Sequence, residues 1–172
     1  MEEFIVQPLL RSPDADAALE QLLHEAYVPA GFTDPNRAAA LFRADAVHAR
    51  GHTLAAQDAS GALLGTVTLV PGASAASLLA VAGEVELHLL AVWADARGRG
   101  IGEALVAAVL REATTARATA VWLWTQPAMQ SAQRLYERLG FRRVPARDFR
   151  VGDREFLVFS RPLTHAAHTG AA

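Results

Sequence analysis

Short apolar runs alternate along this chain with turn residues and with longer segments of helical spacing. Val67 and Leu69 alternate with Thr66 and Thr68, as expected for a half-buried strand. The run 121–125 is almost entirely apolar, which indicates a strand that is buried on both faces. Runs of these two kinds predict about seven strands, at 4–10, 54–57, 62–70, 85–92, 121–125, 141–144 and 155–159.

Helices are indicated by apolar residues three and four positions apart and by residues that suit helix ends. Ser12 and Pro13 suit the N-cap and first position of a helix that runs to about Tyr27. Gly140 suits the left-handed residue that ends another helix. The helices predicted in this way cover 13–27, 36–48, 101–113 with a fraying end at 114–117, and 128–139, with loops at 71–83 and 145–153.

The composition is typical of a globular protein, with 52% hydrophobic and 20% charged residues in a chain of 172. This length predicts one domain, at residues 1–163, followed by a small polar tail at 164–172 that we expect to be disordered. The net charge of −2 gives no general attraction to nucleic acid. No apolar run approaches the roughly 20 residues of a membrane span, and the acidic N-terminus is unlike a signal peptide. We therefore expect a cytoplasmic protein.

The residues that usually bind metals or act as thiol nucleophiles are few or scattered. Cysteine is absent, which excludes disulfides, zinc–thiolate sites and cysteine nucleophiles. Five histidines lack metal-ligand spacing with a carboxylate, so we expect no metal site. These five are His24, His48, His52, His165 and His168.

The segment 97–102 reads RGRGIG and connects the strand 85–92 to the helix that begins at Ile101. Its glycines let backbone N–H groups approach a ligand closely, and the first helical turn adds N–H groups without intrahelical partners. The helix dipole and two arginines add positive charge. The segment is therefore a candidate diphosphate site, with a flexible turn that binds nothing as the alternative.

Two familiar phosphate motifs do not fit this segment. The third glycine of G-x-G-x-x-G is missing in either frame, and no Gly-Lys-Ser/Thr follows as in a Walker loop. The pattern that fits is Arg-x-x-Gly-x-Gly, at Arg97, Gly100 and Gly102. This arrangement resembles the acetyl-CoA loop of the GNAT superfamily of N-acetyltransferases. The segment 132–141, AQRLYERLGF, is similar to the second signature of the same superfamily.

The resemblance implies an α/β (α+β) fold of one domain, with a mixed, mostly antiparallel sheet and helices on both faces. It implies acetyl-CoA as co-substrate, with the pantetheine arm on the end of strand 85–92, where a bulge splays this strand from strand 121–125. The pyrophosphate would lie on the amides of 97–102, and the two arginine side chains either assist or are ordinary surface charge. The cofactor-binding residues implied are Leu90, Ala91, Val92, Arg97, Gly98, Arg99, Gly100, Ile101 and Gly102.

Tyr136 occupies the position in LYERLGF from which GNAT tyrosines donate a proton to the leaving thiolate. A phenol with an unperturbed pKa of about 10 is protonated at pH 7 and can act as this acid. Leu135 and Leu139 flank Tyr136 on an amphipathic helix, so a core tyrosine is the alternative.

Glu86 and His88 share one face of the strand 85–92, because side chains alternate along a strand. Several GNAT enzymes keep a glutamate at the position of Glu86 that deprotonates the amine through water, and we rank it ahead of His88 as the base. The unperturbed pKa of His88, about 6.5, nevertheless matches neutral pH better. Because burying unpaired charges is costly, the alternatives are a mutual pair or a pair with Arg142 or Arg143.

One position departs from the family pattern. The second signature often has an asparagine three residues before its alanine, where the amide hydrogen-bonds the pantetheine. Here this position is Met129, whose thioether cannot donate a hydrogen bond. Gln126 or Gln130 could supply the contact instead.

The sequence therefore predicts an acetyl-CoA-dependent N-acetyltransferase that acts by direct attack of a primary amine, carried by a small molecule or a protein. We expect no nucleic-acid or membrane partner. The oligomeric state stays open, although dimers are common in the family. The alternative from another class is a non-catalytic acyl-CoA-binding sensor or regulatory module, to which Met129 is a hint. Binding without turnover on every amine would favour that module.

Overall fold

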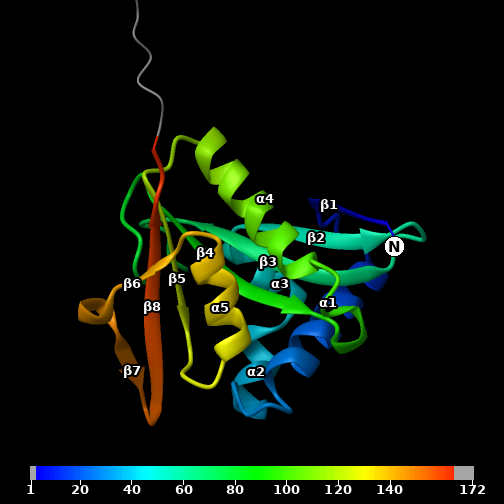
Figure 1. The fold of residues 1–172 in the computed structure, drawn as a ribbon. Coiled ribbons are helices and arrows are strands. Elements are labelled where there is room, and N and C mark those ends of the chain that lie inside the picture. The colour runs from blue at the N-terminus through cyan, green and yellow to red at the C-terminus, as the bar shows by residue number, and fades with distance from the viewer. Residues whose placement is uncertain (1–2, 165–172) are drawn as a thin grey trace, which may run out of the picture.

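A computed structural model describes residues 3–164 of the protein as a mixed sheet with helices on both faces (Figure 1). Within these residues the strands are β1 (Phe4–Pro8), β2 (His52–Asp58), β3 (Leu63–Pro71), β4 (Val85–Val92), β5 (Ala120–Thr125), β6 (Arg142–Arg143), β7 (Phe149–Val151) and β8 (Arg154–Pro162). They are ordered β1-β2-β3-β4-β5-β8-β6, with β7 paired to β8. Only β4 and β5 pair in parallel among the described strands.

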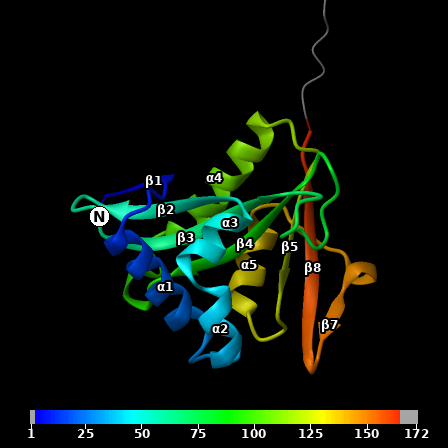
Figure 2. The same ribbon diagram turned by 180° about the vertical axis from the view of Figure 1, so that it is seen from behind.

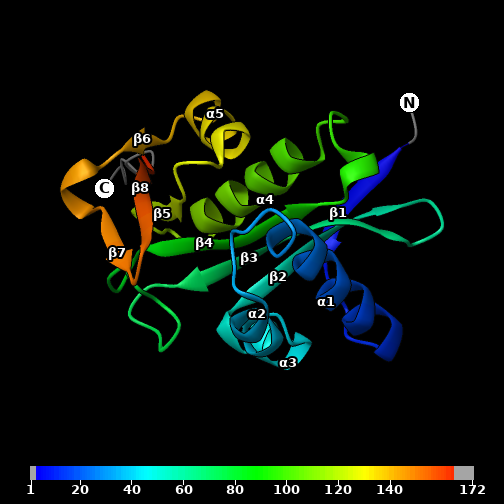
Figure 3. The same cartoon turned by 90° about the horizontal axis from the view of Figure 1, so that it is seen from below.

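The helices divide between the two faces of this sheet (Figures 2 and 3). The helices α1 (Pro13–Tyr27), α2 (Pro35–Leu41) and α3 (Ala44–Arg50) cover one face, and α4 (Ile101–Thr115) and α5 (Gln130–Arg138) lie on the other. Single 3₁₀ turns are found at Ala94–Ala96 and Pro145–Arg147. No helix of residues 3–164 is long and apolar enough to cross a membrane.

Each face of the sheet has its own hydrophobic core. Leu19 and Leu22 of α1 and Val47 of α3 belong to one core, and Leu105 and Val109 of α4 belong to the other. All five side chains are at most 1% exposed. Because both faces are covered, side chains of β4 lie deep in the protein unless the sheet opens there.

Several local predictions are confirmed. The hydroxyl of Ser12 accepts a hydrogen bond from the Ala15 N–H at 3.1 Å and caps α1, whose bounds are those predicted. Gly140 is left-handed, with φ 83°, after α5. The strand β4 also has the predicted bounds. The tail predicted to be disordered lies outside the described residues, apart from residue 164.

The prediction of one helix over 36–48 is wrong, because the chain leaves helical geometry between α2 and α3. Arg43 is extended, with ψ 135°, and the buried ring of Phe42 packs against Tyr27 at a centroid distance of 5.5 Å. The carboxylate of Glu20 accepts a hydrogen bond from the Ala44 N–H at 2.7 Å and so caps α3. Such a cap from another helix leaves no local signal.

The predicted polar loop 145–153 also contains a strand that the sequence did not indicate. β7 pairs with the start of β8 as a hairpin, turned at the left-handed Gly152. Phe149 stacks on Phe156 with ring centroids 5.0 Å apart. Three residues are too few for a periodic pattern, so this eighth strand depends on its cross-strand partner.

The sheet opens between β4 and β5. On one side of β4 the register against β3 shifts between Thr66 and Thr68, and Leu89 has a φ of 54°. This is the bulge that the resemblance implies, since an extra residue bends the strand. On the other side β4 pairs with β5 only at Val85–Val121 and Glu86–Trp122. Beyond these two pairs the strands diverge.

Candidate active site

A cleft of about 1170 Å³ lies where β4 and β5 diverge, and both layers of helices contribute to its walls. From the sheet it is lined by the ends of both strands, including His88 and Trp124. The turn before α4 and the start of α5 line it on one face of the sheet. The helices α1 to α3 line it on the other face. The cleft therefore reaches both faces.

The turn before α4 presents main-chain atoms to the cleft. Gly98 and Gly100 are left-handed, with φ 75° and 81°, and nothing lies within 4 Å of a Cβ built on either. These positions therefore need glycine for backbone conformation and not for space. Gly100 is the N-cap of α4 and no side chain caps the helix, so its first N–H groups are available to a ligand.

The remaining residues of the turn differ in their exposure to the cleft. Gly102 and Ile101 line it, and a Cβ on Gly102 would lie 3.4 Å from the Leu135 side chain. Arg97 also lines the cleft, and its Nε donates to the Val92 carbonyl at 3.3 Å. Arg99 is not among the lining residues. Of the two arginines, Arg97 is thus the one placed toward the candidate diphosphate site.

Glu86 is completely buried and is surrounded by hydrogen-bond donors. One carboxylate oxygen, Oε1, accepts from the Ser77 hydroxyl at 2.9 Å and from the N–H groups of Leu78, Leu79 and Ala80. Burial alone would raise the pKa of Glu86, but these bonds and the bond from His88 outweigh it and lower the pKa to about 2. Glu86 is therefore ionised and holds the loop between β3 and β4.

His88 connects this buried carboxylate to the cleft. Its Nε2 lies 2.7 Å from Oε2 of Glu86. Its ring packs edge-on against Trp124, with the ring centroids 4.6 Å apart. An ionised carboxylate only accepts hydrogen bonds, so Nε2 carries the proton and Nδ1 is unprotonated in the neutral ring. No described residue bonds to Nδ1. His88 lines the cleft, whereas Glu86 does not.

Of the pairings that the sequence left open, the mutual Glu86–His88 pair is the one present. Arg143 pairs instead with Asp148, at 2.7 Å. The carboxylate predicted to work through water has no exposed surface, since its oxygens face loop N–H groups and the histidine. This geometry places His88 between Glu86 and the cleft.

Tyr136 belongs both to the core and to the cleft. It is 5% exposed and lines the cleft from α5, while its ring lies 5.7 Å from Phe141 and 6.3 Å from Phe159. Burial and the neighbouring Tyr27 raise the pKa of Tyr136 above its ordinary value. The hydroxyl therefore stays protonated at neutral pH. The two alternatives given by the sequence, acid and core residue, are compatible in this position.

Comparisons with known proteins agree with this geometry. A family model described as "Acetyltransferase (GNAT) family" matches residues 17–141. This is most of the chain and includes the bulged strand, the glycine turn and Tyr136. The chain belongs to the GNAT acetyltransferase family. No curated protein matches the sequence.

Solved GNAT structures share the fold at low sequence identity. An acetyltransferase of the GNAT family from Staphylococcus aureus has a TM-score of 0.74 at 15% identity, over 94% of this chain and 100% of that one. A Bacillus subtilis acetyltransferase in complex with CoA has 0.67 at 20% identity, over 94% and 100%. The ribosomal-protein-S18-alanine N-acetyltransferase of Escherichia coli has 0.64 at 16% identity, over 97% and 98%.

GNAT enzymes transfer acyl groups from acyl-CoA, and the residues of this GNAT cleft fit that co-substrate. The uncapped N-terminus of α4 and its two left-handed glycines suit a diphosphate. The bulged end of β4, from Leu90 to Val92, has no β5 partner and suits an extended amide arm. No group of three metal-ligating side chains occurs within residues 3–164.

Sequence reasoning missed Tyr27, the last residue of α1. It lines the cleft, and its hydroxyl donates to the Leu90 carbonyl in the bulge at 2.8 Å. Burial raises the pKa of Tyr27, so it remains a donor at neutral pH. Tyr27 follows the apolar stripe of α1, and nothing in the local pattern distinguishes it from a residue that only ends a helix. Its role depends on a bulge 63 positions away.

Met129 stands at the N-cap of α5 and lines the GNAT cleft, without a side-chain capping bond. The two glutamines proposed as substitutes differ. The Gln126 amide donates to the Phe32 carbonyl at 2.7 Å, so it already joins β5 to the loop after α1. Both glutamines line the cleft, Gln130 from the first position of α5. Because the Gln126 amide is already bonded to Phe32, Gln130 is the better candidate to meet a ligand.

Proposed function

We propose that this GNAT protein is an N-acetyltransferase that moves an acetyl group from acetyl-CoA to a primary amine by direct attack. The observation that carries the proposal is the cleft itself, into which a carboxylate-held histidine and a buried, protonated tyrosine both face. Amine acylation needs a group that takes a proton and a group that gives one. His88 and Tyr136 supply these two properties.

His88 is the base in this proposal, and Glu86 is a positioning residue. The carboxylate fixes the tautomer with hydrogen on Nε2, so that Nδ1 can take a proton from the acceptor ammonium or amine. The charge that then develops on the ring is stabilised by the carboxylate at 2.7 Å. A carboxylate that orients an imidazole is a frequent arrangement in acid–base catalysis. The sequence ranked Glu86 ahead of His88 as the base, and in this proposal the order is reversed.

Tyr136 is the acid in this proposal. A phenol whose pKa is raised by burial keeps its proton at neutral pH, so the O–H is available in the cleft. As the C–S bond breaks, negative charge develops on the sulfur, and this O–H would donate a hydrogen bond and then its proton to it. Acetyl-CoA supplies the activated acetyl thioester, and residues 97–102 with the end of β4 would hold its phosphates and its arm.

Release of the CoA thiol with a panel of amines tests the proposal, with His88→Gln as the main variant. We expect kcat/KM of the variant to fall by about 100-fold or more, because a positioned base contributes roughly 10² to 10⁴. The CoA affinity of the variant, measured by calorimetry, should stay within about twofold of that of the parent. His24→Gln is the matched control, since His24 is exposed on α1 and is not a lining residue.

Two results would count against the proposal. Turnover of His88→Gln equal to that of the parent would remove His88 as the base. Tight CoA binding by the parent without turnover of any amine would favour the non-catalytic acyl-CoA-binding module.

A further inference from the structure

We infer that the acceptor amine carries an oxyanion, a carboxylate or a phosphate, which Arg37 and Arg50 bind. The inference rests on the proposed N-acetyltransferase function and narrows its substrate class. Both arginines line the cleft, Arg37 from α2 and Arg50 from the last position of α3. An arginine presents a planar fork of donors that matches the oxygens of either anion.

These two arginines are not explained by the diphosphate site. That site is the main-chain turn at the N-terminus of α4, and α4 lies on the opposite face of the sheet from α2 and α3 (Figure 3). The arginine of the turn, Arg97, already provides a guanidinium there. Arg37 and Arg50 therefore belong to the acceptor side of the cleft.

Neither guanidinium has a carboxylate partner among residues 3–164. Arg50 is half-buried and donates only to the Leu41 carbonyl, at 3.4 Å. Its burial, together with the positive charge of Arg37, lowers the pKa of Arg50. Other arginines form ion pairs, for example Arg11 with Asp16 and Asp45. Two positive charges that face one cavity repel each other, and a bound anion would reduce this repulsion.

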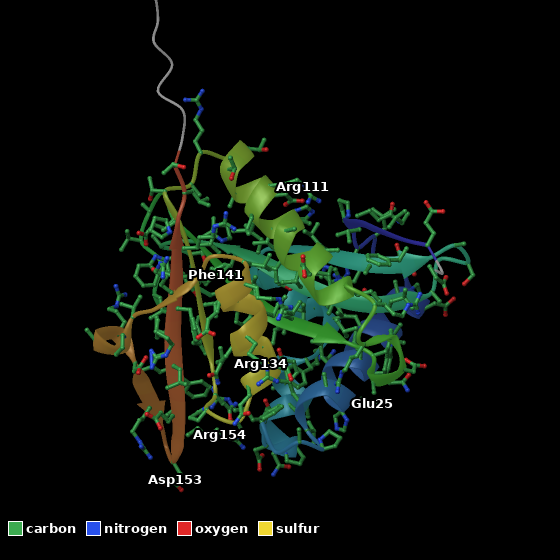
Figure 4. All side chains as sticks on the ribbon, viewed as in Figure 1. Glu25, Arg111, Arg134, Phe141, Asp153 and Arg154 are labelled. Atoms are coloured by element: carbon green, nitrogen blue, oxygen red, sulfur yellow. The ribbon has the colours of Figure 1, made fainter. Side chains whose placement is uncertain are left out.

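Other charges on the acceptor side also favour an anionic acceptor. Arg154, which is labelled in Figure 4, begins β8 and lines the cleft. Its guanidinium donates to the Gly31 carbonyl at 2.7 Å. Glu25 of α1 is the acid on this side among the described lining residues, and it is exposed. Three guanidiniums and one carboxylate would repel a polyamine or an aminoglycoside, whereas an anionic acceptor would be attracted.

The acids near β4 do not change this balance. Glu86 is paired with His88 and four loop donors, and Glu84 accepts from the Trp122 ring N–H at 2.9 Å. Neither lines the cleft. The acceptor side adds apolar surface from Phe32, Leu41, Trp124 and Phe156. An amine with an oxyanion and a hydrocarbon part, such as an amino acid, fits these walls.

The test compares matched amines that differ in the oxyanion alone. The pairs are L-phenylalanine with phenethylamine, and O-phosphoethanolamine with ethanolamine. We expect the parent protein to prefer the anionic member of at least one pair by about tenfold or more in kcat/KM. The pair that shows the preference distinguishes a carboxylate from a phosphate. Arg37→Gln and Arg37→Gln/Arg50→Gln should abolish the preference, because they lower kcat/KM for the amine that carries the oxyanion toward the value for its partner.

Arg43→Gln is the matched control, because Arg43 lies between the two helices, is exposed and does not line the cleft. It should behave as the parent does. The single variant at exposed Arg37 keeps the test valid should the double variant fail to fold. No preference for either anionic amine in the parent, or an unchanged preference in both arginine variants, would overturn the inference. The inference would also be overturned if these variants kept the preference and lost affinity for CoA instead.

Calorimetry with the CoA-saturated protein separates this inference from the proposed function. Anionic amines that bind in an arginine-dependent manner without being acetylated would support the oxyanion site and contradict the acetyltransferase proposal. Acetylation of only the amines that lack an oxyanion would support the acetyltransferase and overturn the oxyanion site. If no amine reacts and none binds, both fail.

Discussion

The two sides of the cleft are built from different parts of the polypeptide. On the side of α4, the cleft is lined by a main-chain turn, set by left-handed glycines and a helix N-terminus. On the side of α1 to α3, it is lined by side chains such as Tyr27, Arg37 and Arg50. A main-chain site needs a particular backbone shape, which few residue types allow, whereas a side-chain site can be supplied from many positions. The first kind therefore leaves a sequence signature and the second does not.

The largest expected effect comes from placing charge in the main-chain side. Gly100→Asp/Gly102→Asp puts two carboxylates where phosphates are expected and a Cβ 3.4 Å from the Leu135 side chain. We expect the affinity for CoA in calorimetry to fall by about a thousandfold, or about 4 kcal/mol. Gly61→Asp, at another exposed left-handed turn, is the control for strain. Parent-like affinity of the double variant would contradict a phosphate site in this turn.

The next effect concerns Glu86, the buried carboxylate that bonds to His88. The pKa of Glu86 is about 2 in the folded protein against about 4.5 for an unperturbed glutamate, so between these values the unfolded chain binds more protons. Its stabilisation is complete above about pH 4.5 and is lost as the pH falls toward 2. In urea unfolding, Glu86 should contribute on the order of 3 kcal/mol to the unfolding free energy above about pH 4.5. Glu86→Gln should lack this contribution and its loss in acid.

Glu84→Gln is the matched control for this pH dependence. Glu84 is half-exposed and bonds to Trp122 and to the Val81 N–H. It should keep the parent's loss of stability between pH 4.5 and 2. An unchanged acid profile in Glu86→Gln would show that the loop donors do not hold Glu86 in its ionised form.

A smaller effect is expected at Tyr136, where only one oxygen is removed. Tyr136→Phe keeps the ring contacts with Phe141 and Phe159 but removes the proposed proton donor. We expect kcat to fall by about 10- to 100-fold while the CoA affinity changes less than about twofold. Steady-state kinetics and calorimetry on the same preparation check both numbers. Unchanged turnover would return Tyr136 to a role in the core.

The smallest effect is expected at Tyr27, which braces the bulge. Tyr27→Phe leaves the Leu90 carbonyl without its donor at 2.8 Å, which should cost about 1 kcal/mol of unfolding free energy. Tyr136→Phe is the comparison, because the Tyr136 hydroxyl has no hydrogen-bond partner among the described residues and its loss should cost less. Equal stability of the two variants would mean that the Tyr27 bond does not support the bulge.

The parts of the fold that sequence could predict are those with local causes. Strand 85–92, the capped helix 13–27 and the left-handed Gly140 each follow from nearby residues, and all are confirmed. The split of 36–48 into α2 and α3 was missed because its cap, Glu20, lies on another helix. The strand β7 was missed because it depends on stacking with Phe156.

The candidate site divides in the same way. The turn 97–102 and Tyr136 could be named from motifs, and both line the cleft except at Arg99. The sequence placed Glu86 and His88 on one strand face and ranked Glu86 first as the base. The loop 77–80 that folds over Glu86 has no local signal there, and it is the reason why we now propose His88 instead. No motif marks Tyr27, Arg37 or Arg50, so only the folded chain brings them to the cleft.

The two residue pairs that join β4 to β5 have a consequence for the behaviour of the whole molecule. The interior of the sheet is held by fewer main-chain bonds than its flanks, since β3–β4 and β5–β8 are long ladders. An extended molecule lodged beside Leu90 would add bonds where the protein has fewest. Occupancy should then raise the melting temperature with ligand concentration, so that the substrate also acts as a structural support.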